Sequence, residues 1–165
     1  MAVGAGLVRS DHVTTPGPVP TEVGETFTLT VRLSEIEIAA GARQLCDLNP
    51  LHHDPAAARA AGYPGLIASG AHTGAIFMGM TATHFSTPAP DGGPRSILGL
   101  GFDIRFCAVV LADEDVVLRW TVTGADWKTS LRGWVTKAAG EVHTPRGLVL
   151  SGTASLLLRR PVALI

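Results

Sequence analysis

A long uncharged run constrains this sequence more than any other feature. No Asp, Glu, Lys or Arg occurs between Arg59 and Asp91. A segment of this kind belongs in a protein core or in a membrane. A spanning helix needs about 20 mainly apolar residues, whereas the best window here, 71–85, is shorter and contains several polar residues. We therefore predict a buried helix over 71–84 and no membrane span.

The predicted helix is rich in small residues at spacings of three and four. Glycine is unfavourable in a helix interior because it loses more backbone freedom than any other residue. Two glycines there indicate that a sheet or a second backbone packs very close. The small residues are Ala71, Gly74, Ala75, Gly79 and Ala82.

The rest of the chain alternates apolar and polar residues with a period of two, which is typical of strands with one buried face. The first such segment covers 26–33, before the helix. The later ones are 98–107, 116–122, 131–136 and 148–158, separated by breaks near 112–115, 124–126 and 143–147. One long helix and a mainly antiparallel sheet define an α+β fold, with the strands curled around the helix. Such a sheet leaves free edges, which favours association of subunits.

The N-terminal half contains two shorter helices. Ser34 with Glu37 three residues later forms a capping box, which predicts a helix over 35–45. Pro55 opens an alanine-rich helix that Gly62 ends. Residues 1–24 are rich in proline and lack periodicity, so we expect an extended or mobile leader before a single domain over 25–165.

Bulk properties exclude several functions. The net charge is −1, which gives no electrostatic case for binding nucleic acid or an anionic membrane. Only 16% of the residues are charged, which is low for a globular protein and indicates that a partner chain covers part of the surface. The cysteines, Cys46 and Cys107, lack metal-ligand spacing, and the first residues do not resemble a signal peptide. We expect a cytoplasmic protein with reduced thiols.

Polar chemistry is concentrated in the segment 46–54, which holds two carboxylates, two imidazoles and a carboxamide. Pro50 prevents a continuous helix and pushes Asn49 toward extended geometry. A stiff polar loop between helices is a common place for functional residues. A simpler reading also exists, because Asp47 and Asn49 are frequent in caps and turns.

The histidines and the second aspartate of this segment have plainer interpretations. Asp54 precedes Pro55 and can cap the following helix. Adjacent His52 and His53 point apart on one loop and lack a third soft ligand, so we predict no metal site. His53 is expected at the surface, and His72 is expected to be satisfied structurally within the long helix.

The hexapeptide Asp47-Leu48-Asn49-Pro50-Leu51-His52 resembles the signature of the MaoC-like, (R)-specific enoyl-thioester hydratases and 3-hydroxyacyl-thioester dehydratases. A glycine just before the central helix, here Gly70, is similar to the next family feature. The strand 102–106 also resembles the family pattern, and the similarity extends over about 25–160. The chain departs from the pattern at Leu45-Cys46, where Ser-Gly is usual, and at Ser69, where histidine is common.

This resemblance implies a hot-dog fold, in which an antiparallel sheet wraps one long helix and two copies form a continuous sheet. It implies reversible hydration of a trans-2-enoyl thioester of coenzyme A or acyl carrier protein to the (R)-3-hydroxyacyl thioester. No metal and no organic cofactor is expected, since the thioester carrier belongs to the substrate. The expected assembly is a homodimer or a dimer of dimers.

The resemblance also assigns roles to individual residues. His52 is expected to act as the base and Asp47 as its partner or as a proton donor, with Asn49 holding their geometry. The free N–H of Gly70 is expected to bind the thioester oxygen as negative charge develops. The residues expected to contact the substrate are Ser69, Ala71, Ile76, Phe77 and Met80.

Two rival functions remain open on the sequence. A hot-dog thioesterase usually carries its acid on the central helix, and here 71–84 contains no carboxylate. A non-catalytic hot-dog subunit of a hetero-oligomer often loses the dyad, which this chain keeps. The assay that separates these functions is hydration or hydrolysis of a panel of acyl thioesters.

Overall fold

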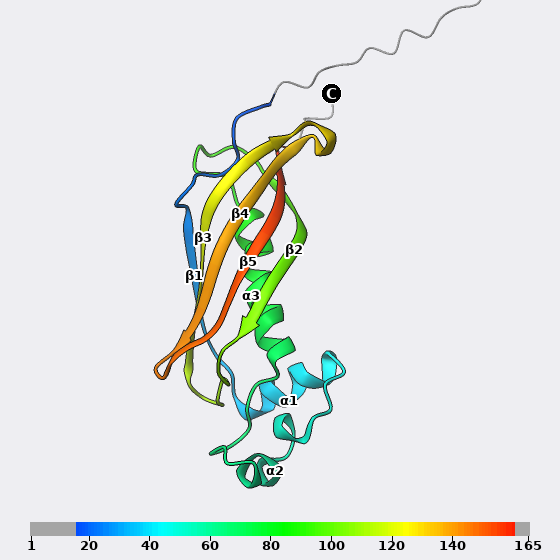
Figure 1. The fold of residues 1–165 in the computed structure, drawn as a ribbon, viewed down its shortest axis with the longest axis vertical. Helices are drawn as coiled ribbons and strands as arrows, with labels where there is room; N and C mark the ends of the chain where they lie inside the picture. Colours follow the sequence, from blue (N-terminus) through cyan, green and yellow to red (C-terminus); the bar gives the residue numbers. More distant parts are fainter. Residues whose placement is uncertain (1–15, 161–165) are drawn as a thin grey trace, which may run out of the picture.

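One antiparallel sheet packs a face on a single long helix in the computed structural model, which describes residues 16–160 (Figure 1). The helix, α3, covers Gly70–Phe85, close to the predicted 71–84. The other helical elements are α1 (Glu35–Gln44), α2 (Pro55–Ala60) and two short 3-10 turns, η1 (Pro50–His52) and η2 (Thr129–Leu131). The strands are β1 (Thr26–Arg32), β2 (Ser96–Phe106), β3 (Asp115–Lys128), β4 (Gly133–Thr144) and β5 (Gly147–Arg159).

The five strands have the order β1-β3-β4-β5-β2 and all neighbours are antiparallel. β1 and β2 therefore form the two edges of the sheet. Short turns connect β3 to β4 and β4 to β5, so sequential strands are neighbours in the sheet's centre. The register shifts between Gly99 and Gly101 in β2 and between Val122 and Gly124 in β3. Such bulges increase the local twist of a sheet.

The core lies between α3 and the inner face of the sheet. Phe77 of α3 is fully buried and stacks on Trp120 of β3, with 4.1 Å between ring centroids. The Trp120 indole N–H donates to the Phe77 carbonyl oxygen at 2.8 Å. A Cβ on Gly140 would lie 2.6 Å from both rings, so only glycine lets this stacked pair lie against β4.

This packing changes the interpretation of the small residues in α3. A Cβ on Gly74 would meet Phe106 and Ile104 at ordinary contact distances, which fits close packing of β2 on the helix. Nothing lies within 4 Å of a Cβ at Gly79, so the close approach predicted there is wrong. Close approaches to side chains of α3 occur at glycines outside this helix, at Gly140 against Phe77 and at Gly41 against His72.

Two strand predictions also differ from the structure. The expected break at 124–126 is wrong, because β3 continues to Lys128 with a bulge between Val122 and Gly124. The strand predicted at 131–136 is displaced and longer, since Leu131 belongs to η2 and β4 runs from Gly133 to Thr144. The breaks before β3 and between β4 and β5 are confirmed.

A polar network joins β1 to the C-terminal end of α3. The Arg95 side chain is 1% exposed and donates to Glu25 Oε1 at 3.0 Å and to the Pro20 carbonyl oxygen. His84 Nε2 lies 2.7 Å from the same Glu25 oxygen, and the His84 ring stacks on Phe27.

The described part of the predicted leader, 16–24, contains no helix or strand, although Pro20 and Thr21 are buried. Its first fifteen residues, 1–15, lie outside the described range, as do 161–165 at the other end of the chain. None of the helices within 16–160 is long and apolar enough to cross a membrane.

Candidate active site

The polar segment forms a turn at the end of the molecule where α3 begins (Figure 1). Ser34 caps α1 with the predicted capping box, and α1 ends at Gln44. Cys46 then adopts a left-handed conformation with φ of 59°, and the Asp47 N–H donates back to the Ala42 carbonyl oxygen at 2.9 Å. This reversal of the chain directs the Asp47 side chain back toward the start of α3.

The proline forms a 3-10 turn rather than a continuous helix, as predicted. Pro50 is its first residue, and the Asn49 side chain caps it by accepting the Leu51 N–H at 3.2 Å. The amide oxygen of Asn49 is therefore engaged in shaping the turn. This turn places His52 five residues after Asp47 but directly beside it.

Asp47 and His52 form a close pair. His52 Nε2 lies 3.2 Å from Asp47 Oδ2, and His52 is 6% exposed. The other ring nitrogen, Nδ1, lies 2.8 Å from the Ile67 carbonyl oxygen. Since a carbonyl only accepts, Nδ1 carries a proton, and Nε2 is the nitrogen that faces the carboxylate.

The carboxylate of Asp47 receives further hydrogen bonds. The Ser69 hydroxyl donates to Oδ2 at 2.6 Å, and the Asn49 N–H donates to Oδ1 at 3.2 Å. These two bonds, opposed by partial burial and aided by the nearby His52 and His53, hold the pKa of Asp47 below its usual range. Asp47 is consequently an anion at neutral pH.

Gly70 is the first residue of α3 and follows Ser69, whose hydroxyl contacts Asp47. Ser69 is the N-cap residue, but its side chain makes no capping hydrogen bond, so it leaves the first N–H groups of the helix unoccupied. The Phe106 ring covers the glycine, because a Cβ on Gly70 would lie 3.2 Å from Phe106 Cε1. The positive end of the α3 dipole thus points into this corner.

A cavity of about 210 Å³ brings His52 and Gly70 together. Thr73 and Phe106 contribute to its wall. Apolar residues form the rest of the lining, namely Ile67, Ala68, Ala108, Val109, Val110, Val149 and Leu150. A mostly apolar cavity with a few convergent polar groups is typical of a small-molecule site.

The structure brings together four of the predicted site residues, Asp47, His52, Ser69 and Gly70, while Asn49 supports their turn. The predicted acyl-chain residues lie elsewhere. Ile76 and Met80 line a separate cavity of about 550 Å³ between β1 and α3, and Phe77 is fully buried against Trp120. Ala71 is exposed and does not line the cavity at His52.

The lining residues that sequence reasoning missed come from distant segments. Phe106 ends β2, Val110 lies in the segment between β2 and β3, and Val149 lies in β5. Their residue types do not distinguish a cavity wall from ordinary core. Only the folded chain brings them next to His52.

The other polar residues of the loop, Asp54 and His53, make different contacts. The Asp54 carboxylate accepts the Ala56 N–H at 2.8 Å and so caps α2, as one reading predicted. His53 is half-buried instead of lying at the surface, and its Nε2 is 2.8 Å from the Asp47 carbonyl oxygen. Within 16–160, no group of three or more His, Cys, Asp or Glu side chains could hold a metal ion.

His72 packs against α1, where its ring occupies the place a Cβ would take on Gly41. Burial lowers the pKa of His72, and the nearby Glu37 opposes this shift. The ring faces the neighbouring helix and does not line the cavity at His52. Its Nδ1 is buried without a hydrogen-bond partner among the described residues, so the expectation that His72 is satisfied structurally is wrong.

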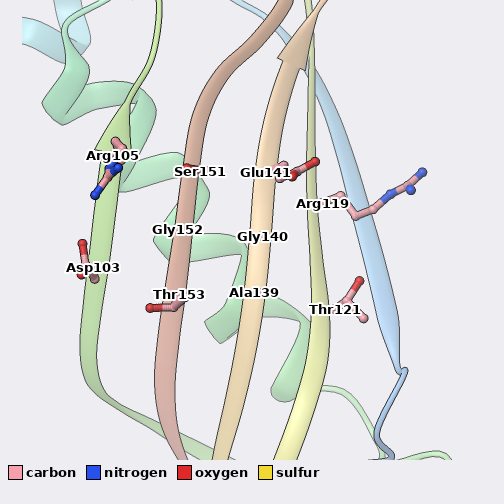
Figure 2. A pocket seen from close by; sticks show the side chains of 10 residues that line it. All are labelled: Asp103, Arg105, Arg119, Thr121, Ala139, Gly140, Glu141, Ser151, Gly152 and Thr153. Atoms are coloured by element: carbon pink, nitrogen blue, oxygen red, sulfur yellow. The ribbon is translucent and has the colours of Figure 1, made fainter.

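A larger hollow of about 580 Å³ lies on the outer face of the sheet, away from α3 (Figure 2). Small residues of β4 and β5 form its floor, and the charged side chains of Asp103, Arg105, Arg119 and Glu141 stand around it. An antiparallel sheet commonly has one solvated polar face. None of the loop residues contributes to this hollow, so the cavity at His52 is the candidate active site.

Comparisons with known proteins identify the family of this chain. The family model described as "MaoC like domain" matches residues 16–144. This chain therefore belongs to the MaoC-like domain family. A search of curated protein sequences finds no match.

Solved structures give the fold and the class of activity. An (R)-hydratase from A. caviae involved in PHA biosynthesis is 25% identical, with a TM-score of 0.69, and the match covers 85% of this chain and 97% of that one. A MaoC-like dehydratase from Rhodospirillum rubrum is 27% identical, with a TM-score of 0.67 and coverages of 86% and 95%. The R-hydratase PhaJ1 from Pseudomonas aeruginosa is 25% identical, with a TM-score of 0.67 and coverages of 87% and 90%. The fold is the predicted α+β hot-dog fold, and the similarity supports a hydratase or dehydratase activity.

Proposed function

We propose that this chain is a hydro-lyase that reversibly adds water to a trans-2-enoyl thioester of coenzyme A or acyl carrier protein, forming the (R)-3-hydroxyacyl thioester. One observation carries the proposal. His52 Nε2 lies 3.2 Å from Asp47 Oδ2 and shares a cavity with Gly70, at the open start of α3. This arrangement places a base, His52, and its anionic partner, Asp47, near an oxyanion donor, the N–H of Gly70.

His52 acts as the base in this mechanism. With its proton on Nδ1, a neutral His52 can take a proton from water at Nε2. The imidazolium that results is stabilised by the adjacent Asp47 carboxylate. The lowered pKa of Asp47 favours the role of anionic partner over that of proton donor, since the carboxyl group is ionised at neutral pH.

The water oxygen bonds to the β-carbon while the electrons of the double bond move toward the thioester carbonyl. The Gly70 N–H and the α3 dipole stabilise the enolate oxygen that forms. His52 then delivers its proton to the α-carbon. Water has thus been added across the double bond, and the dyad returns to its starting state.

We also propose a homodimer, alone or as half of a dimer of dimers, formed through the edge strand β2. Three large apolar side chains on this strand, Leu98, Leu100 and Phe106, are 56%, 48% and 56% exposed. An edge strand with such side chains is prone to pair with another strand. Phe106 also lies against Gly70, so this interface would border the active site. The exposed free thiols Cys46 and Cys107 fit a cytoplasmic protein.

The decisive test measures hydration of crotonyl-CoA and longer enoyl thioesters, on coenzyme A and on carrier protein, with the chirality of the product. Asp47→Asn and His52→Gln should each lower kcat by at least about 10²-fold, because general acid–base assistance is typically worth roughly 10²–10⁴-fold. Circular dichroism checks that both variants fold.

Ser130→Ala is a suitable control, because Ser130 is exposed and lies in η2, away from the loop. Wild-type rates in either dyad variant would rule out the assignment. Release of a free thiol without hydration would favour the thioesterase. A chain that is active only with a second polypeptide would favour the hetero-oligomeric subunit.

A further inference from the structure

Two residues outside the dyad contact Asp47 from different sides. Ser69 contacts its carboxylate, and His53 contacts its backbone. Ser69 departs from the family pattern, in which histidine is common at this position. Neither residue has a role in the proton transfers described above.

Among residues 16–160, the Ser69 hydroxyl has a single hydrogen-bond partner, Asp47. As the N-cap residue of α3, a serine would ordinarily use its side chain to cap the helix. Here the side chain makes no capping bond, although Ser69 is fully buried. Its hydroxyl donates instead to Asp47 Oδ2, the same oxygen that faces His52. The bond therefore fixes the oxygen that pairs with the base.

His53 holds the peptide group of Asp47. Its Nε2 lies 2.8 Å from the Asp47 carbonyl oxygen, and since a carbonyl accepts, Nε2 carries the proton. Its Nδ1 is buried without a hydrogen-bond partner in the described part of the chain. A buried polar atom without a partner is unfavourable and calls for an explanation. The bond to the Asp47 carbonyl oxygen explains why Nδ1 is left without a partner, because the His53 ring must lie in this position to make that bond.

We propose that Ser69 and His53 are positioning residues that clamp Asp47 against His52, Ser69 through the carboxylate and His53 through the backbone carbonyl. This inference rests on the proposed hydration for its catalytic consequence. Three side chains surround Asp47 in this arrangement: Ser69, His53 and His52 itself. We call the contacts of Ser69 and His53 the Asp47 clamp.

The two halves of the clamp predict different effects. Ser69 donates directly to the ionised carboxylate, so its loss removes the largest influence that lowers the Asp47 pKa. His53 bonds to a neutral carbonyl and contributes only a weak charge effect on that pKa. Loss of His53 should therefore disturb the position of Asp47 more than its ionisation.

The first experiment is kinetic. Ser69→Ala and His53→Leu should each lower kcat for enoyl-thioester hydration, by up to about 100-fold for a displacement near 1 Å, with little change in KM. His53→Gln keeps an N–H donor near the position of Nε2 and should restore most of kcat. Ser130→Ala, which removes an exposed hydroxyl far from the site, should leave kcat unchanged.

The second experiment does not depend on activity. Titration of the Asp47 carboxyl carbon by ¹³C NMR gives its pKa directly in each folded variant. Ser69→Ala should raise the Asp47 pKa toward the ordinary value for aspartate. His53→Leu should raise it less, while thermal unfolding verifies that both variants are folded.

These readouts separate failure of the clamp from failure of the proposed function. An unchanged Asp47 pKa in Ser69→Ala, or equal kcat values in His53→Leu and His53→Gln, would overturn the clamp. If the wild-type protein hydrates no enoyl thioester but the Asp47 pKa still rises in Ser69→Ala, the clamp stands and the proposed hydration is wrong.

Discussion

Asp47 and Asp54 follow α1 in the same polar loop, and each carboxylate accepts a backbone N–H two residues ahead. They differ in what else they contact. Asp47 also meets the Ser69 hydroxyl and the His52 ring, whereas Asp54 is exposed and serves α2 as its N-cap. We therefore expect loss of the Asp47 side chain to affect catalysis and loss of the Asp54 side chain to affect stability.

Asp54→Ala tests this separation. The variant loses the N-cap of α2, so we expect the free energy of unfolding to fall by about 1 kcal/mol, as is typical for such caps. The value of kcat should stay close to wild type, because the Asp54 carboxylate does not face the cavity. Urea denaturation and the hydration assay measure the two quantities. A large loss of kcat with unchanged stability would move Asp54 into the site.

The variant Gly70→Ala tests whether the substrate approaches Gly70 at the start of α3. The variant keeps the backbone N–H but adds a methyl group 3.2 Å from the Phe106 ring, inside the cavity. An extra methylene in a substrate pocket is worth roughly 1–3 kcal/mol, so we expect kcat/KM to fall about 10-fold or more. The added methyl group would meet only the edge of a side-chain ring, which needs to shift by a few tenths of an ångström, so the melting temperature should change little. Wild-type kcat/KM would show that the substrate does not approach Gly70.

The local part of the site could be predicted from the sequence, but its long-range contacts could not. The spacing from Asp47 to His52 depends on one proline turn, which residue types alone can indicate. The bond from Ser69 to Asp47 joins positions that only packing of the α1 end on α3 brings together. The sequence placed the acyl chain along the central helix, at Ile76, Phe77 and Met80. In the structure Ile76 and Met80 face β1, away from His52.

At the scale of elements, alternation predicted the strands best in β3 and β4, where buried residues alternate with more exposed ones. The exception is informative. Gly124 indicates a turn, yet it pairs with Lys137 just after a bulge, and the pairing of β3 with β4 continues on both sides. A sequence pattern cannot distinguish a bulge from a break, since the partner strand decides between them.

The polar network of Glu25, His84 and Arg95 predicts how the stability of the protein depends on pH. Burial acts to raise the pKa of Glu25, but hydrogen bonds from Thr21, His84 and Arg95 outweigh it and leave the pKa below its usual value of 4.5. The folded protein therefore binds a proton at Glu25 less readily than the unfolded chain. The stabilisation from Glu25 is present above pH 4.5 and is lost as the pH falls through the lower folded value.

The variant Glu25→Gln measures this stabilisation. At neutral pH the variant leaves the buried Arg95 without its anion, and we expect a loss of about 3 kcal/mol in the free energy of unfolding. The difference between wild type and variant should shrink as the pH is lowered below 4.5. Denaturation curves across this range measure it. A difference that stays constant with pH would mean that Glu25 does not titrate between the two states.

At the scale of the whole molecule, one edge of the sheet differs from the other in its relation to the active site. β2 ends at Phe106, whose ring covers Gly70, while β1 lies at the opposite edge beside the second cavity. A partner strand on β2 would fix the position of Phe106 and close one side of the cavity at His52. Association and activity are thus expected to be linked.

The double variant Leu98→Lys with Leu100→Lys tests this link. Lysines on an edge strand oppose pairing with another strand, so we expect a change from dimer to a monomer of 17.2 kDa in light scattering. The variant should also lose kcat/KM, because Phe106 becomes free to leave Gly70. Leu148→Lys is the matched control, since Leu148 is also exposed but lies near the β4–β5 turn. A double variant that remains dimeric would place the interface elsewhere, and a fully active monomer would show that the site is complete in one chain.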